Sequence, residues 1–145
     1  MKVLLQRVTE ARVTVDDETV GAAGPGLLLF LGAEKNDDDE QAVRLARRVL
    51  GYRVFADDAG KMNRSVLDAG GELLVVPQFT LAADTRKGTR PSFSSAAPPE
   101  QGERLYEAFW QALREGGIMP ATGRFGADMQ VQLINDGPVT FLLES

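Results

Sequence analysis

The chain contains neither cysteine nor histidine. Without cysteine it has no disulfide, no thiolate ligand for zinc and no thiol nucleophile. Without histidine it lacks the usual general base at neutral pH and the commonest metal-binding side chain, which excludes Ser-His-Asp catalysis and histidine-bound zinc. Any catalysis must therefore use carboxylates, hydroxyls, lysine, backbone groups or the substrate itself.

Long apolar runs are also absent. The longest, from Leu27 to Leu31, is far shorter than the ~20 residues that a membrane-spanning helix needs. The apolar start at Val3 is soon interrupted by Gln6 and Arg7, unlike a secretion signal. With 43% hydrophobic and 26% charged residues, the composition is typical of a globular domain. We therefore expect one domain over residues 1–145 with one functional site, neither secreted nor spanning a membrane. The lack of cysteine is compatible with a cytoplasmic location.

Positive charge is scarce, because 16 lysines and arginines face 21 acidic residues and give a net charge of −5. Proteins that coat nucleic acid neutralise many phosphates, so this balance argues against that class. Binding to one end of an RNA is still compatible with this net charge. Arg86, Lys87 and Arg90 place three cations within five residues, a pattern that fits a local phosphate contact and a solvated loop equally well.

Hydrophobic periodicity predicts several short strands and two helices. Their order, strands then helix, strand, helix and strands, predicts a mixed α+β domain with much antiparallel pairing. The expected strands are 2–8 and 11–16 as a hairpin, 27–32, 73–76, 129–133 and 139–143; the expected helices begin within 36–40 and at 98–99 and end at the glycines 51 and 116–117.

Two acidic segments superficially resemble metal motifs. The tract from Asn36 to Glu40 is better explained as a helix start, because carboxylates there accept unpaired N–H groups, and Asp37 with Glu40 has capping-box spacing. The segment from Asp57 to Gly60 lacks the further oxygen ligands of a calcium loop and is predicted to be a turn.

One candidate site follows the strand at 73–76. Pro77 removes a donor from the sheet ladder, so the chain should leave regular pairing near Gln78. The N–H groups of Gln78 and Phe79 would then be free to polarise a ligand oxygen, although a purely structural bulge explains the same pattern. Thr80 is a hydroxyl without an adjacent histidine base, so we expect it to hydrogen bond and not to act as a nucleophile.

A second candidate site is the segment Asn135-Asp136-Gly137-Pro138-Val139-Thr140, which we expect to turn the chain into the last strand. A Gly-Pro pair alone is a weak signal, since Gly24-Pro25 is another. Arg7, beside the apolar run of the first strand, either braces this Gly-Pro loop or is a surface arginine at a strand edge.

Several segments together resemble the D-aminoacyl-tRNA deacylase family. They are residues 75–81 (VVPQFTL), 90–93 (RPSF), 122–125 (TGRF) and 135–140 (NDGPVT), with further matches at 5–8 (LQRV), 50–53 (LGYR) and 60–63 (GKMN). The likeness covers essentially the whole chain. Many matches in the same order are far more specific than any single motif.

The resemblance implies a fold and an activity. The fold would be α+β, with a mixed, largely antiparallel, barrel-like sheet flanked by two main helices. The activity would be hydrolysis of the ester that joins a D-amino acid, or mischarged glycine, to the terminal adenosine of tRNA. L-Aminoacyl-tRNA would be rejected, a form of chiral proofreading in translation. The expected partners are D-aminoacyl-tRNA, glycyl-tRNA and a second copy of the chain, with no metal, cofactor or membrane.

The family's two signatures place the site residues. Ser-Gln-x-Thr carries onto Gln78, Phe79 and Thr80 as the catalytic segment. This chain departs from it at Pro77, where the family usually has serine, and so loses a hydroxyl and an N–H. Asn-x-Gly-Pro-x-Thr carries onto the last segment, with Gly137 and Pro138 as substrate-binding residues and with Asn135 and Thr140 in support.

The resemblance also implies a mechanism that needs no histidine. The Gly-Pro peptide of the family is cis, and its carbonyls enter the other subunit's site, where they hold the substrate amino group and block an L side chain. The 2′-hydroxyl of the terminal adenosine assists ester cleavage, and the Phe79 N–H is a candidate donor to the ester carbonyl. Positioning alone can supply several kcal/mol of barrier reduction.

Two other functions compete with this one. The first is a threonine-type hydrolase of small esters, with Thr80 as nucleophile and Lys61 or Lys87 as base, which would accumulate an acyl-enzyme. The second is a module that binds an RNA end or a peptide without turnover.

Overall fold

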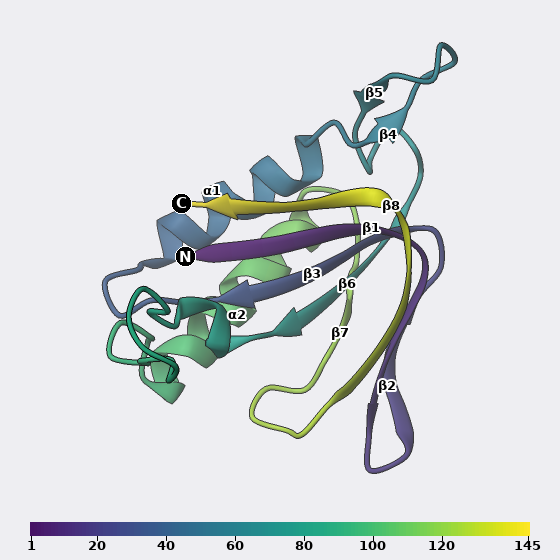
Figure 1. The fold of residues 1–145 in the computed structure, drawn as a ribbon. Helices are drawn as coiled ribbons and strands as arrows, with labels where there is room; N and C mark the ends of the chain where they lie inside the picture. Colours follow the sequence, from purple (N-terminus) through teal and green to yellow (C-terminus); the bar gives the residue numbers. More distant parts are fainter.

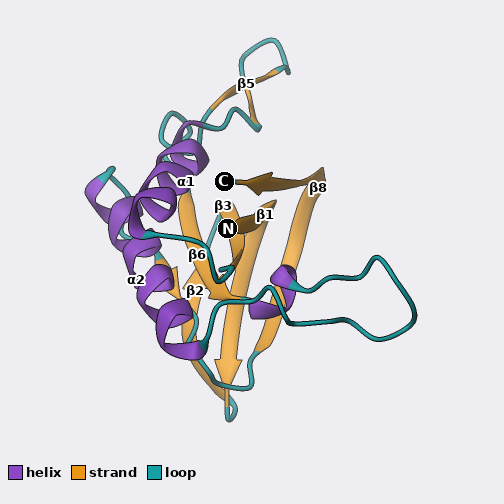
Figure 2. Ribbon diagram, turned by 90° about the vertical axis from the view of Figure 1, so that its left-hand side faces the viewer, coloured by secondary structure: helices purple, strands orange, loops and turns teal.

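A strongly curved sheet with two helices packed against one of its faces forms the body of the protein (Figure 1). The computed structural model describes all residues from Met1 to Ser145. Figure 2 shows both helices on the same side of the strands, with a long loop extending from the opposite side. In chain order the elements are β1 (Lys2–Val15), β2 (Glu18–Ala23), β3 (Gly26–Gly32), α1 (Asp39–Gly51), β4 (Phe55–Ala56), β5 (Met62–Arg64), β6 (Glu72–Pro77), the 3-10 helix η1 (Phe79–Ala82), α2 (Pro99–Glu115), β7 (Ala121–Thr122) and β8 (Gln130–Glu144).

The sheet is mixed and nearly closes into a barrel, so the expected α+β class is confirmed. Its order is β2-β1-β3-β6-β7, and β8 pairs with the long strand β1. The pairs β1–β2, β1–β3 and β1–β8 are antiparallel, whereas β3–β6 and β6–β7 are parallel. The two ends of the path approach each other where β2 meets β7. Gly21 permits this approach, because a side chain there would clash with the Thr122 carbonyl oxygen.

Two hydrophobic cores lie on the two faces of the sheet. The larger, between sheet and helices, contains 23 buried residues, including Phe109 and Leu113 of α2. The smaller contains seven buried residues, including Val13 and Leu28, on the other face. Strand β3 contributes to both, which explains why residues 27–31 form an unbroken apolar run.

The predicted hairpin between residues 2–8 and 11–16 is wrong. β1 runs without interruption from Lys2 to Val15, and the chain reverses afterwards at Asp16 and Asp17, whose φ angles are 50° and 65°. Positive φ at both central positions is typical of a two-residue hairpin turn. The polar pair Thr9-Glu10 is exposed within the strand, so its polarity marks solvent exposure and not a turn.

The start of α1 lies one residue later than its predicted capping box. Asp38 is the N-cap: its carboxylate accepts from the Gln41 N–H at 2.9 Å, and the Gln41 side chain accepts from the Asp38 N–H at 2.8 Å. Asp37 is instead buried and accepts from the Met1 amino group at 2.9 Å. Asp37 therefore binds the N-terminus of the chain, and Asp38 caps the helix.

A short hairpin of β4 and β5, which the sequence did not predict, surrounds the predicted turn at residues 57–60. The Asp57 carboxylate accepts from the Ala59 and Lys61 N–H groups at 2.9 and 3.0 Å and from the Asn63 side-chain amide at 2.9 Å. These hydrogen bonds lower the pKa of Asp57, and the one from Asn63 has the largest effect. Asp57 is thus a turn residue, as predicted.

Candidate functional site

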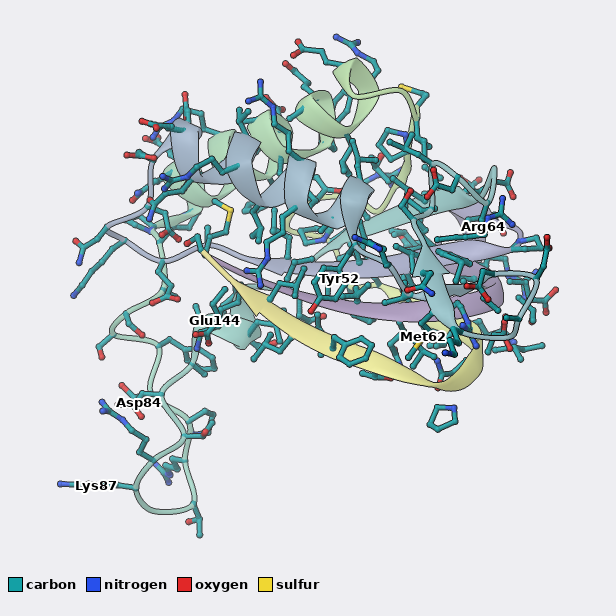
Figure 3. All side chains as sticks on the ribbon, turned by 90° about the horizontal axis from the view of Figure 1, so that it is seen from above. Tyr52, Met62, Arg64, Asp84, Lys87 and Glu144 are labelled. Carbon is teal, nitrogen blue, oxygen red and sulfur yellow. The ribbon has the colours of Figure 1, made fainter.

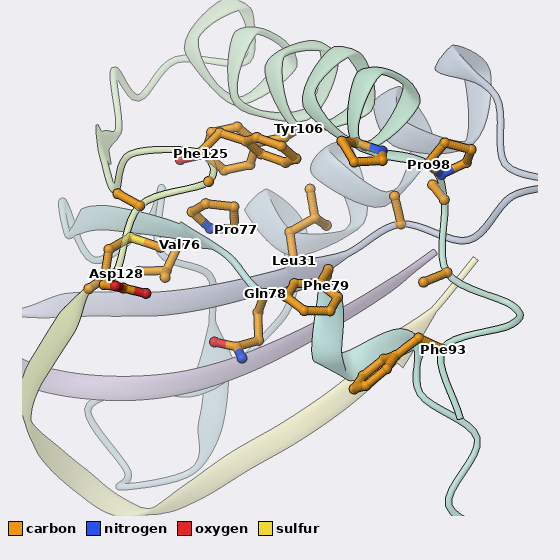
Figure 4. Close-up of a pocket in the computed structure, with 18 of the residues that line it drawn as sticks. Leu31, Val76, Pro77, Gln78, Phe79, Phe93, Pro98, Tyr106, Phe125 and Asp128 are labelled. Carbon is orange, nitrogen blue, oxygen red and sulfur yellow. The ribbon is translucent and has the colours of Figure 1, made fainter. Parts of the chain in front are cut away.

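A cavity of about 720 Å³ lies where β3 and β6 end, beneath the start of α2 (Figure 4). Its walls come from the end of β6, the segment before α2, α2 itself and the loop that leads into β8. The volume is in the range of sites for small organic ligands. Pro77, Gln78 and Phe79 line it, so the structure places most of the first predicted segment at a cavity wall.

Pro77 is the last residue of β6, opposite Leu31 of β3. Gln78 continues this pairing by one hydrogen bond, because its N–H donates to the Leu31 carbonyl at 2.8 Å. The prediction that the Gln78 N–H is free is therefore wrong. The proline ends the strand, but only after the next residue has made its contact with β3.

Phe79 is the first residue of η1, so its N–H has no partner inside that helix. The preceding residue, Gln78, makes no side-chain cap. Phe79 is 60% exposed, and its ring contacts the ring of Phe93, with the centroids 5.3 Å apart. The backbone of Phe79 therefore provides the available donor at this wall of the cavity.

Thr80 lies in η1 but does not line the cavity. Its hydroxyl oxygen accepts a hydrogen bond from the Gln78 side-chain amide. Lys61 and Lys87 do not line the cavity either. The geometry thus offers no nucleophile–base pair for the threonine-type hydrolase.

The sequence reasoning missed several cavity residues. Tyr106 of α2 is buried and donates its hydroxyl to the Val75 carbonyl at 3.0 Å. Burial raises the pKa of Tyr106, so the phenol stays neutral and acts as a donor. Phe93 and Phe125 belong to segments that carried the resemblance but had no assigned role, and nothing in the sequence pattern distinguished Asp128, the acidic residue of the lining.

The second predicted segment is not a turn, which corrects the expectation for residues 135–138. It remains within β8 and forms a bulge there. Pairing with β1 steps from Gln6–Thr140 to Val8–Asn135, so Arg7 faces residues 136–139. The bulge lets β8 continue along β1 while several of its peptide groups leave the ladder.

Arg7 braces this bulge. Its Nε donates to the Asp136 carbonyl at 3.0 Å and lies 3.2 Å from the Asp136 carboxylate, and its Nη1 donates to the Val54 carbonyl at 2.6 Å. The side chain is only 17% exposed. Of the two interpretations of Arg7, the structure favours the bracing one over the surface arginine.

Asn135 and Gly137 define the path of the bulge. The Asn135 side-chain amide donates to the Arg7 carbonyl at 2.8 Å and to the Val139 carbonyl at 3.2 Å. A side chain at position 137 would clash with the Asn135 side-chain oxygen, so a larger residue there would displace Asn135 or the bulge. The Gly137–Pro138 peptide is cis, and the Thr140 hydroxyl accepts from the Gln6 amide at 3.2 Å.

The two predicted segments do not meet within one chain. None of the residues from 135 to 140 lines the cavity, nor does Arg7. The cavity residues and the bulge are therefore two separate surfaces of a single subunit.

The chain has no group of three or more acidic residues placed to hold a metal ion. Neither helix combines the length and apolarity of a membrane span.

The chain is similar to known proteins of one family. The family model described as D-Tyr-tRNA(Tyr) deacylase matches residues 4–144. A protein from Idiomarina loihiensis named D-aminoacyl-tRNA deacylase is 61% identical over 141 residues, with 97% of each chain covered. A protein of the same name from Cronobacter sakazakii is 60% identical over 144 residues, with 99% of each chain covered.

Solved structures show the same fold. A structure titled c-Myc DNA Unwinding Element Binding Protein superposes with a TM-score of 0.95 at 43% identity, covering 100% of this chain and 99% of that one. A structure titled as a probable eukaryotic D-amino acid tRNA deacylase superposes with a TM-score of 0.84 at 19% identity, covering 98% and 97%. The second likeness supports the fold alone.

Proposed function

Because this chain belongs to the D-Tyr-tRNA(Tyr) deacylase family, we propose that it proofreads the chirality of aminoacyl-tRNA in the cytoplasm. The chain is an enzyme, a hydrolase of the D-aminoacyl-tRNA deacylase class. The finer proposal is that it cleaves D-aminoacyl and glycyl esters of tRNA and leaves L-aminoacyl esters intact. The observation that carries this proposal is the available Phe79 N–H at the wall of a cavity without a nucleophile–base pair.

The proposed reaction is the addition of water to the ester carbonyl carbon. Negative charge develops on the carbonyl oxygen, where the Phe79 N–H stabilises it as an oxyanion donor does. The bond between the carbonyl carbon and the ribose oxygen then breaks. The ribose oxygen takes up a proton, which releases the amino acid and tRNA. The neighbouring 2′-hydroxyl assists this proton transfer, since no side chain of the cavity is placed as a paired base.

A homodimer is proposed from the exposed surface of β8. This 15-residue strand pairs only with β1, so its other edge carries unpaired backbone groups. Ile134, Phe141 and Leu142 are large hydrophobic residues exposed on it. A long apolar edge strand is a ready site for association with a second chain. Self-association here would bring the bulge of one subunit toward its partner.

The bulge is proposed to read chirality in the partner's cavity. Backbone carbonyls of Gly137 and Pro138 would hold the substrate amino group and occupy the space that an L side chain needs. A D side chain points elsewhere and is accepted. Glycine has no side chain to exclude, so glycyl-tRNA is also a substrate.

Gly137→Ala is expected to lower the rate on D-tyrosyl-tRNA at least about tenfold, because a misplacement of about 1 Å can cost about 10²-fold. The new Cβ clashes with the Asn135 side-chain oxygen and lies 3.0 Å from the Val139 nitrogen, so either the bulge shifts or the Asn135 side chain moves away from the Arg7 and Val139 carbonyls that it holds. Single-turnover hydrolysis of D- and L-tyrosyl-tRNA measures the effect. Some L cleavage is a second expected sign of the shifted carbonyls.

Gly51→Ala is the matched control, because no atom lies within 4 Å of a Cβ at that position. It should leave both rates unchanged. Light scattering should give a mass of two chains of 15.7 kDa for the native protein and for both variants. An active 15.7 kDa monomer, or a Gly137→Ala variant with native rates, would contradict the shared site.

A further inference from the structure

Residues 84–92 form an exposed arm that the proposed reaction does not use. Two hydrogen bonds close its base, from the Asp84 N–H to the Ser92 carbonyl at 2.8 Å and from the Ser92 N–H to the Asp84 carbonyl at 3.0 Å. Every residue from 85 to 91 is exposed. In Figures 2 and 3 this arm projects away from the sheet and helices, and Figure 3 shows Lys87 near its tip. We call residues 84–92 the basic arm.

Two of its three cations are without an acidic partner. Arg86 is engaged by Asp84, with its Nε and Nη2 donating to the carboxylate at 2.9 and 2.7 Å. These hydrogen bonds lower the pKa of Asp84, so that carboxylate stays charged and neutralises Arg86. Lys87 and Arg90 make no ion pair within the chain. The basic arm thus presents two uncompensated positive charges on a protein whose net charge is −5.

The basic arm begins and ends at the mouth of the cavity. It follows η1, whose first residue Phe79 lines the cavity, and it is followed directly by Phe93, which also lines the cavity and contacts Phe79. The Ser95 hydroxyl donates to the Ala82 carbonyl at 2.8 Å and ties the two flanks together. A ligand that extends out of the cavity on this side meets the arm first.

We propose that the basic arm binds the backbone phosphates of the single-stranded tRNA end just outside the cavity, through Lys87 and Arg90. This inference rests on the proposed function. A cavity of about 720 Å³ has room for the aminoacyl group and its nucleoside, so the preceding phosphates lie outside. Cations beside exposed aromatic rings are a common way to hold a single strand without reading its sequence.

The experiment compares native protein with the double variant Lys87→Gln and Arg90→Gln, using D-tyrosyl-tRNA at several salt concentrations. Each phosphate contact to a single strand contributes about 0.7 to the slope of log affinity against log salt, so the variant's slope should be shallower by about 1.4. The ratio of native to variant kcat/KM should therefore fall about sevenfold between about 50 and about 200 mM salt. On D-tyrosyl-adenosine, which has no phosphate, the two proteins should be equal.

Two further variants are controls. Arg44→Gln with Arg47→Gln removes the same charge from exposed positions on α1 and should leave the salt slope native. Lys87→Arg with Arg90→Lys keeps the charges and should also keep the native slope. The inference is overturned if the arm variant retains the native slope, or if its kcat/KM falls equally on D-tyrosyl-adenosine. It is also overturned if the α1 variant shows the same change in slope. Native protein that fails to hydrolyse D-tyrosyl-tRNA would instead contradict the proposed function.

Discussion

Phe79→Pro should lower kcat on D-tyrosyl-tRNA by about 10²–10³-fold, the loss that follows removal of one oxyanion donor. Proline has no N–H, and position 79 is the first of a short helix, where proline fits and no helical hydrogen bond is lost. Gln78 has φ −140° and ψ 76°, so its φ lies within the range that a residue before proline adopts, whereas its ψ lies below the favoured ~120–160°. The substitution therefore removes the donor and requires an adjustment of the Gln78 backbone.

Phe79→Ala is the matched control, because it removes the ring and keeps the N–H. Its kcat should fall less than tenfold, with the larger effect on KM, since the exposed ring contacts Phe93 at the mouth of the cavity. Rapid quench under single-turnover conditions measures both variants, and thermal melting checks the fold. Equal losses in the two variants would show that the ring, and not the N–H, carries the effect.

Replacing the 2′-hydroxyl of the terminal adenosine by hydrogen should slow ester cleavage by about 10²-fold or more, because a positioned acid–base group contributes that much. The cavity offers no paired side chain to take over. Tyr106 is committed to the Val75 carbonyl with a raised pKa, and the Thr80 hydroxyl is outside the cavity.

The 2′-deoxy substrate should still bind with nearly native affinity, because its phosphates and aminoacyl group are unchanged. Competition with D-tyrosyl-tRNA measures this affinity. A deoxy substrate cleaved at the native rate would assign the proton transfer to the protein, with Asp128 as the acidic group of the cavity to test next.

Much of the fold was predictable because local patterns agree with it. The apolar runs at 27–31 and 73–76 are buried strands, and the glycines at 51 and 116 lie at the ends of the two helices. The predictions fail where a polar segment is not a turn. Thr9-Glu10 and Asn135-Asp136 are exposed residues inside long strands, and only their pairing partners, far away in the chain, determine that they stay extended.

The candidate site was predictable in part. Pro77 marked the end of β6, but the hydrogen bond of the Gln78 N–H to Leu31 depends on tertiary pairing that no local pattern encodes. Arg7 is mostly buried and bonds to Asp136 of the bulge and to Val54, both far from it in the chain. Tyr106 has the spacing of a core residue in α2 and is buried as one, but it also lines the cavity, which its spacing does not predict.

The most direct test of the central claim is hydrolysis of matched D- and L-tyrosyl-tRNA by the native protein in the presence of EDTA. The account predicts rapid loss of the D ester, while the L ester decays at the rate seen without protein. Equal cleavage of both esters, or tight binding of the D ester without turnover, would contradict it.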